Sequence, residues 1–290
     1  MNGVVFSLIL GTATPGGGFP VFGAAYSEAL VAQEPRLRIE TRNTRGSAEN
    51  VPLLEAGKLD LGLVAGELAS AALAKPGTGL RIVAAMYASP GMFMVRADSP
   101  VRSFADLTGK PVVFGATGSG ITALGRTVLQ SLEIPVVEIL LEKVADGPPM
   151  LQDGRAAALW GAGVGWPAFN ALAKAGGRFV GPDAGEVRRI LAKQPSLQAV
   201  TLPARSYPGQ DAPLPSVGSW SFVFARPGLP EEQGYLLARA LHRAEGPLAA
   251  RLEQAKETTA ANTVAASPHA ELIHPGAQKY FREIGLLRPQ

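Results

Sequence analysis

Residues 4–18 read VVFSLILGTATPGGG, an apolar run that passes directly into a loop of glycine and hydroxyl residues. The apolar run is far shorter than the ~20 residues of a membrane span, and no basic residue stands before it as in a secretory signal peptide. The stretch therefore predicts a strand over 4–10, a glycine-rich loop over 11–18 and a helix over 20–33.

The alternation of strands and helices continues after this helix. A half-buried strand is expected over 37–41 and a further strand over 59–64. Between them a helix begins at Ser47 or at Asn50, because Pro52 is tolerated only in a first turn. This β-α-β-α-β order is typical of a parallel sheet with helices on both of its faces.

A second unit of the same kind begins near residue 100. A strand over 111–114 leads into a second glycine-rich loop over 115–120 and a helix over 121–132. Two further strands are expected over 136–141 and 156–160, with a short helix between them over 149–153.

A late apolar run over 219–225 predicts one more strand, and helices are expected over 231–244 and 247–255. The predicted fold class is therefore α/β, with two units that each hold a mostly parallel sheet flanked by helices.

The composition excludes several classes of function. The chain of 290 residues has no cysteine, which excludes disulfides, thiolate metal sites, iron–sulfur clusters and cysteine nucleophiles. Its net charge of +3 is too small and too dispersed for a nucleic-acid surface. The three histidines, His242, His269 and His274, have no metal-ligand spacing, so neither a metal site nor a cofactor is expected.

The glycine-rich segments match no enzyme motif. The segment GATGSG at 115–120 is neither a nucleophile elbow nor a phosphate-binding Walker loop. The glycines at 161, 163 and 165 lack the spacing of a dinucleotide-binding loop. We therefore expect a protein that is not an enzyme.

Three loops of glycine and hydroxyl residues each follow a predicted strand and precede a helix, at 12–19, 44–47 and 117–120. In a parallel sheet such loops meet at the carboxyl ends of the strands, where ligands bind. Glycine lets backbone N–H groups approach a ligand, and helix N-termini favour anions. Any one loop is equally explained as a tight turn, but three together favour an anion site in a cleft.

A few side chains near these loops are candidate ligand contacts. Arg45 can hold a carboxylate bidentately beside the hydroxyl of Ser47, unless it simply faces solvent. Glu67 can receive an ammonium group or serve as a surface helix cap. Three aromatic residues near predicted strand ends can supply flat walls to a site: Tyr87, Trp160 and Trp166. For Trp160, packing in the core is an equally good explanation.

The order and spacing of several motifs are similar to those of the TAXI family, the extracytoplasmic solute receptors of TRAP transporters. The motifs run over nearly the whole chain: Gly16-Gly17-Gly18, Gly46-Ser47-Ala48-Glu49-Asn50, Asp60-Leu61-Gly62-Leu63-Val64, Gly118-Ser119-Gly120 and His274-Pro275-Gly276-Ala277. The resemblance implies a type II periplasmic-binding-protein fold, in which crossing strands join two lobes and a small organic solute is held between them. Lobe 1 is then expected over 1–98 and 219–290, and lobe 2 over 99–218.

Together, the loops and the resemblance imply one set of ligand-binding residues. They are Thr14, Gly17, Gly18, Phe19, Thr44, Arg45, Ser47, Asn50, Glu67, Tyr87, Thr117, Gly118, Ser119, Trp160 and Trp166. In the family a tyrosine often stands where this chain has Phe19, so one possible hydrogen bond to a ligand is missing. The resemblance also assigns His274 to a C-terminal turn.

The expected function is capture of a small organic anion, a carboxylate or an amino-acid-like solute, for the membrane subunits of a TRAP transporter. The receptor is expected to be a periplasmic monomer whose signal peptide is absent from this sequence, with no nucleic-acid partner. An ABC-importer receptor for a sulfonate or a pyrimidine is the alternative. A pyrimidine-synthase-like enzyme is less favoured, and so is a transcription-regulator effector domain, since no helix-turn-helix segment is present.

Overall fold

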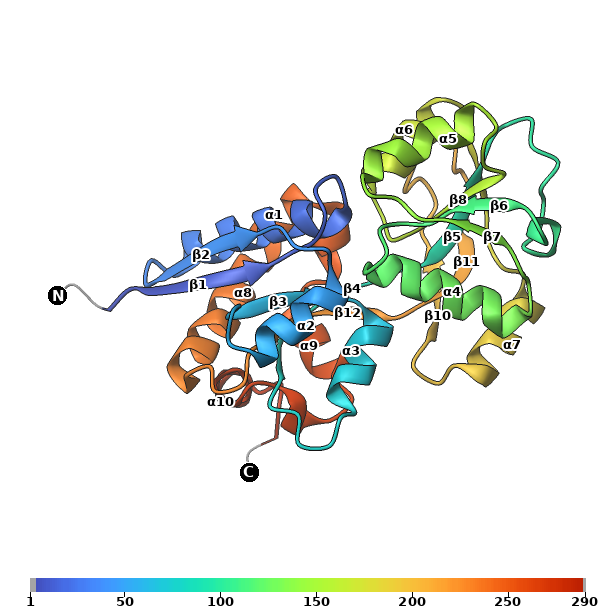
Figure 1. Cartoon of the computed structure of the whole chain (residues 1–290). Coiled ribbons are helices and arrows are strands. Elements are labelled where there is room, and N and C mark those ends of the chain that lie inside the picture. The colour runs from blue at the N-terminus through green and yellow to red at the C-terminus, as the bar shows by residue number, and fades with distance from the viewer. Residues whose placement is uncertain (1–3, 289–290) are drawn as a thin grey trace. The chain divides into compact units, whose positions relative to one another are not determined.

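The computed structural model describes residues 4–288 and shows a chain divided into two α/β units (Figure 1). Unit 1 contains the chain up to Ala13, Phe19–Tyr87 and the segment from Trp220 onward. Unit 2 contains Thr14–Gly18 and Ala88–Ser219. Each unit has its own five-stranded sheet and its own hydrophobic core.

The sheet of unit 1 has the order β2-β1-β3-β12-β4. Strand β1 runs parallel to β2 and to β3, whereas β12 runs antiparallel to β3. The strands span Phe6–Gly11 (β1), Leu37–Arg42 (β2), Leu61–Val64 (β3), Arg81–Ala88 (β4) and Trp220–Ala225 (β12).

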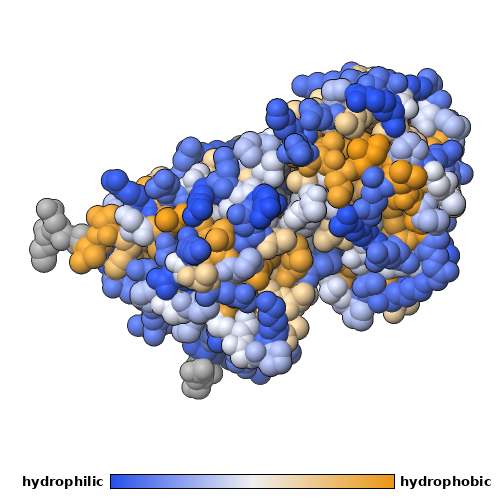
Figure 2. Space-filling model, in the orientation of Figure 1, coloured by the Kyte–Doolittle hydropathy of each residue, from blue (hydrophilic) through white to orange (hydrophobic). Residues whose placement is uncertain are grey.

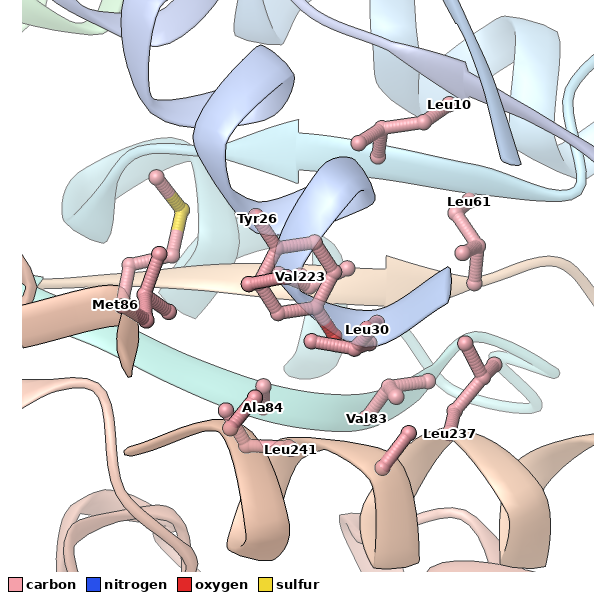
Figure 3. Close-up of a cluster of buried hydrophobic side chains, with 14 of the residues drawn as sticks. Leu10, Tyr26, Leu30, Leu61, Val83, Ala84, Met86, Val223, Leu237 and Leu241 are labelled. Carbon is pink, nitrogen blue, oxygen red and sulfur yellow. The ribbon is translucent and has the colours of Figure 1, made fainter. Parts of the chain in front are cut away.

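Helices α1 (Gly18–Gln33) and α8 (Glu231–Arg251) bury their apolar residues with one face of this sheet. Figure 3 shows Leu30 of α1 and Leu241 of α8 in this cluster, together with the strand residue Val223. Burial of each such side chain stabilises the fold by roughly 1.5–3 kcal/mol. A second cluster combines β3, β4 and β12 with α2 (Ser47–Glu55) and α3 (Gly66–Leu73). The remaining helices of unit 1 are α9 (Ala260–Ala266), α10 (Pro275–Glu283) and the 3-10 helices η3 (Glu253–Glu257) and η4 (Ala270–Leu272).

The sheet of unit 2 has the order β7-β6-β8-β5-β9. Strand β6 is parallel to β7 and β8, whereas β5 is antiparallel to β8 and β9. The strands span Gly91–Val95 (β5), Pro111–Val113 (β6), Val137–Ile139 (β7), Ala158–Ala162 (β8) and Arg178–Val180 (β9). A separate antiparallel pair consists of β10 (Gln198–Leu202) and β11 (Leu214–Gly218).

Helices flank the unit 2 sheet, and its core contains the fully buried Trp160, Phe93 and Phe104. The helices are α4 (Gly120–Leu132), α5 (Gly147–Gln152), α6 (Pro167–Lys174), α7 (Ala184–Lys193) and the 3-10 helices η1 (Ala105–Leu107) and η2 (Val144–Asp146).

Two sequence-based expectations about helices were wrong. Neither Ser47 nor Asn50 caps α2, because Gly46 holds that position with φ 103°, a conformation that glycine adopts without strain. The helices expected over 231–244 and 247–255 join into one helix, α8, which continues through Pro247 and ends at Arg251, and residues 253–255 belong to η3. A proline costs a helix one hydrogen bond, and the buried Leu248 anchors the turn that contains Pro247 in the unit 1 core.

Among the described residues, no helix combines the length and the apolar character that crossing a bilayer requires. Hydrophilic residues cover much of the face of each unit in Figure 2, with hydrophobic residues between them. The large hydrophobic side chains with the greatest exposure are Val4, Val5, Ile9, Val21, Val137 and Leu140.

Candidate functional site

The carboxyl ends of β1, β2 and β3 lie at one edge of the unit 1 sheet because these strands are parallel. Helices α2 and α3 begin at this edge, after Gly46 and Ala65. The N-cap residues of these two helices, Gly46 and Ala65, make no capping hydrogen bond through a side chain. Main-chain N–H groups at a helix start without such a cap can bind an anion.

Asn50 holds this edge together from within. Its amide nitrogen donates to the carbonyl oxygens of Thr12 and Leu63, both at 2.8 Å, and lies 3.3 Å from that of Gly11. The residue is fully buried. It thus links the main chain at the end of β1 to the main chain at the end of β3.

Thr44 and Ser47 contribute to the same buried network. The hydroxyl of Thr44 donates to the amide oxygen of Asn50 at 2.8 Å and accepts the Gly46 N–H at 3.1 Å. The hydroxyl of Ser47 accepts the Ala65 N–H at 3.0 Å. Three side chains expected to bind ligand therefore bind the protein's own main chain or one another.

Arg45 lies at the same edge but faces solvent, with 84% of its side chain exposed. The Glu49 carboxylate accepts the Arg45 backbone N–H at 2.7 Å and lies 3.3 Å from its guanidinium. These contacts hold the pKa of Glu49 below its usual range, and the hydrogen bond from the Arg45 backbone N–H has the largest effect. The charge of Arg45 is thus already balanced by a neighbour.

Three further candidates lie in unit 1 and three in the Thr14–Gly18 segment of unit 2, and all six are partly or fully buried. The ring of Tyr87 is buried and contacts Phe22 edge-on at 5.4 Å between centroids. Phe19 packs against the core cluster at the start of α1, and Glu67 lies in the first turn of α3. The loop residues Thr14, Gly17 and Gly18 are half-buried.

Unit 2 has a comparable edge, where the parallel strands β6, β7 and β8 end. Ser119 caps α4 by accepting the Thr122 N–H at 3.3 Å, and the Thr122 hydroxyl donates to the Ala116 carbonyl at 3.0 Å. In the same loop Thr117 is exposed and Gly118 is half-buried. The N-terminus of α4 therefore lies at this edge with one first-turn N–H already bonded.

The loop at 163–166 follows β8 at this edge, and Tyr207 holds it. The Tyr207 hydroxyl donates to the Gly163 carbonyl at 2.9 Å and accepts the Trp166 N–H at 3.0 Å. Gly163 and Gly165 have φ values of 91° and 72°, which glycine adopts readily. Sequence reasoning missed Tyr207, because a single tyrosine in a proline- and glycine-containing stretch carries no signal of this contact.

The two tryptophans expected to line the site have different environments. Trp160 is fully buried, contacts Phe93 at 4.8 Å, and donates its indole N–H to the Ile121 carbonyl at 2.8 Å. It is a core residue, as the competing interpretation held. Trp166 is 6% exposed and packs on Phe169, and its indole N–H has no hydrogen-bond partner among the described residues.

Both edges thus offer helix N-termini and glycine-loop main chain, held in place by buried side chains. An exposed helix N-terminus stabilises an anion by about 0.3–1 kcal/mol, and a drier one by more. Within residues 4–288, no group of three or more His, Asp and Glu side chains is placed to hold a metal ion.

The chain matches the NMT1-like family over residues 10–285. The periplasmic aliphatic sulphonate binding protein SsuA from Escherichia coli is 19% identical, with a TM-score of 0.51 and coverage of 98% of this chain and 94% of that chain. The TctC solute binding protein from Polaromonas is 17% identical, with a TM-score of 0.53 and coverage of 89% of this chain and 90% of that chain. The substrate binding protein of an amino acid ABC transporter is 16% identical, with a TM-score of 0.51 and coverage of 86% of this chain and 99% of that chain. These likenesses confirm the expected type II periplasmic-binding-protein fold.

Proposed function

The chain belongs to the NMT1-like family, and from this we propose that it is a solute-binding receptor that captures a small organic anion, either a carboxylate or an amino-acid-like molecule. The solute-binding proteins named above share its fold. The proposal concerns binding without chemical turnover.

One observation carries this proposal: parallel strands in both units end at an edge where helices begin. At the unit 1 edge, α2 and α3 start without a side-chain cap. The buried polar side chains there, Asn50 and Thr44, hold the edge through hydrogen bonds to the main chain and to each other. Recognition would then depend on main-chain N–H groups, which select for negative charge and shape.

We further propose that the protein acts in the periplasm and delivers its solute, as a monomer, to the membrane subunits of a TRAP transporter. The support is the resemblance of its motifs to the TAXI receptors. The neighbouring genes test this choice. A large multi-span permease is expected beside this gene, and an ATPase gene in its place would assign the receptor to an ABC importer.

A sulfonate-binding ABC receptor is the second candidate. The sulphonate binding protein SsuA covers nearly all of both chains in the comparison, which supports this alternative. A sulfonate and a carboxylate are both compact oxyanions, so the same N–H groups can bind either one.

Isothermal titration of the purified protein with L-glutamate, succinate and ethanesulfonate tests the proposed function. We expect saturable binding of one solute per chain for at least one of the three. Binding of ethanesulfonate alone would favour the second candidate. The absence of binding to all three would refute the proposal for these solute classes, and intact mass spectrometry would then test the enzyme alternative through a covalently modified side chain.

A further inference from the structure

Tyr207 lies far in sequence from the residues it contacts. It belongs to the segment between β10 and β11, and its ring packs against Phe169 and Phe179 with centroid distances of 5.8 Å and 5.0 Å. The residue is 3% exposed. Burial is the main reason that the pKa of Tyr207 is raised, so the hydroxyl stays protonated and can donate its hydrogen bond.

The loop that Tyr207 contacts has little rigidity of its own. Gly163 and Gly165 both have positive φ values, and glycine has the largest choice of backbone conformations. The Gly163 N–H donates to the Pro90 carbonyl at 3.0 Å, which fixes the beginning of the loop. The Tyr207 hydroxyl bonds Gly163 and Trp166, and thus fixes both of its ends.

This loop also sets the position of Trp166. Trp166 is the N-cap residue of α6, so the loop conformation determines where that helix begins. Its indole N–H is a buried donor without a partner among the described residues. A buried donor of this kind is costly unless something accepts its hydrogen bond, which points to a role beyond packing.

We propose that Tyr207 is a positioning residue for ligand binding, because it fixes the loop 163–166 and the Trp166 side chain at the unit 2 edge. It does so through its hydroxyl and does not touch the ligand. The inference rests on the proposed function and adds to it a residue that determines affinity.

The chain offers a matched pair of variants for this test. Tyr207→Phe removes only the hydroxyl that bonds the loop. Tyr26→Phe removes a hydroxyl from an equally buried tyrosine whose oxygen has no hydrogen-bond partner among the described residues. Gly165→Ala perturbs the same loop by another route, because the added methyl group has open space but φ 72° strains an alanine.

The first measurement is amide hydrogen exchange, which needs no ligand. In the wild-type protein the Trp166 amide should exchange slowly. In Tyr207→Phe it should exchange at least about tenfold faster, since it loses its acceptor, while amides of the unit 1 sheet stay unchanged. Fast exchange of this amide in the wild-type protein would overturn the inference.

The second measurement is titration with whichever of L-glutamate, succinate and ethanesulfonate binds the wild-type protein most tightly. We expect Tyr207→Phe and Gly165→Ala to weaken binding about tenfold, and Tyr26→Phe to leave it unchanged, with circular dichroism confirming that all three are folded. Equal affinity of Tyr207→Phe and wild type would overturn this inference alone. If the wild-type protein binds none of the three solutes, the proposed function fails and the inference falls with it.

Discussion

Replacement of Asn50 by alanine should destabilise unit 1 more than any change at an exposed polar residue. Asn50 is fully buried and donates to the Thr12 and Leu63 carbonyls, both at 2.8 Å. Each buried acceptor that loses its partner costs about 1–3 kcal/mol. The Leu63 carbonyl loses the Asn50 donor, whereas the Thr12 carbonyl keeps the Thr44 hydroxyl at 3.2 Å, so the expected loss in the free energy of unfolding of unit 1 is about 1–3 kcal/mol.

The assay is urea denaturation at 25 °C, followed by amide exchange to assign the loss to unit 1. Assignment to one unit is needed because two units need not unfold together. Asn262→Ala is the control, since the amide of Asn262 makes one exposed bond to the Glu257 carbonyl at 2.8 Å and should contribute no more than about 1 kcal/mol. A loss below about 1 kcal/mol in Asn50→Ala would refute the assignment of Asn50 to the edge network.

Three further predictions follow from single contacts. Burial holds the pKa of His274 below its usual range, and the ring bonds the Leu229 carbonyl and the Gly276 N–H. The free energy of unfolding should therefore be highest above about pH 6.5 and fall as the pH drops below that, because the unfolded chain then binds a proton that the folded chain does not. Urea midpoints at about pH 7.5 and 5.5 measure this, and an equal drop in His274→Gln would contradict it. Gly46→Ala should destabilise by about 1–3 kcal/mol in the same assay because of its φ of 103°, and no loss would show that the backbone relaxes. Arg45→Ala should weaken solute binding less than about fivefold, since the side chain is exposed and paired, and a larger loss by titration would restore Arg45 as a ligand contact.

The sequence predicts the main elements of both sheets because their apolar runs and glycine loops are strong local signals. It does not predict β4, β5, β9, β10 and β11 as strands. For β5 the reason is that its partners, β8 and β9, lie far along the chain, where a local pattern does not reveal them. The antiparallel pairing of β5 with β8 places β5 in unit 2. The chain therefore passes from unit 1 to unit 2 between residues 87 and 88, whereas the expected boundary lay after residue 98.

The candidate site was predictable in position but not in the role of each residue. Strand order places the glycine loops at the sheet edges, and this follows from the sequence alone. The direction of a polar side chain does not follow from residue type, so Asn50 was expected to face a ligand although it faces the main chain. Tyr207 could not be found at all, because its contact with the loop joins residues 41 positions apart.

The most direct test of the central claim, that the solute binds at the carboxyl edges of the sheets, is amide hydrogen exchange of the wild-type protein with and without the solute that binds it. The account predicts slower exchange at the α2 start, residues 46–48, and at the unit 2 loops, residues 117–120 and 163–166. Unchanged exchange at all three segments, with protection elsewhere in the chain, would contradict it.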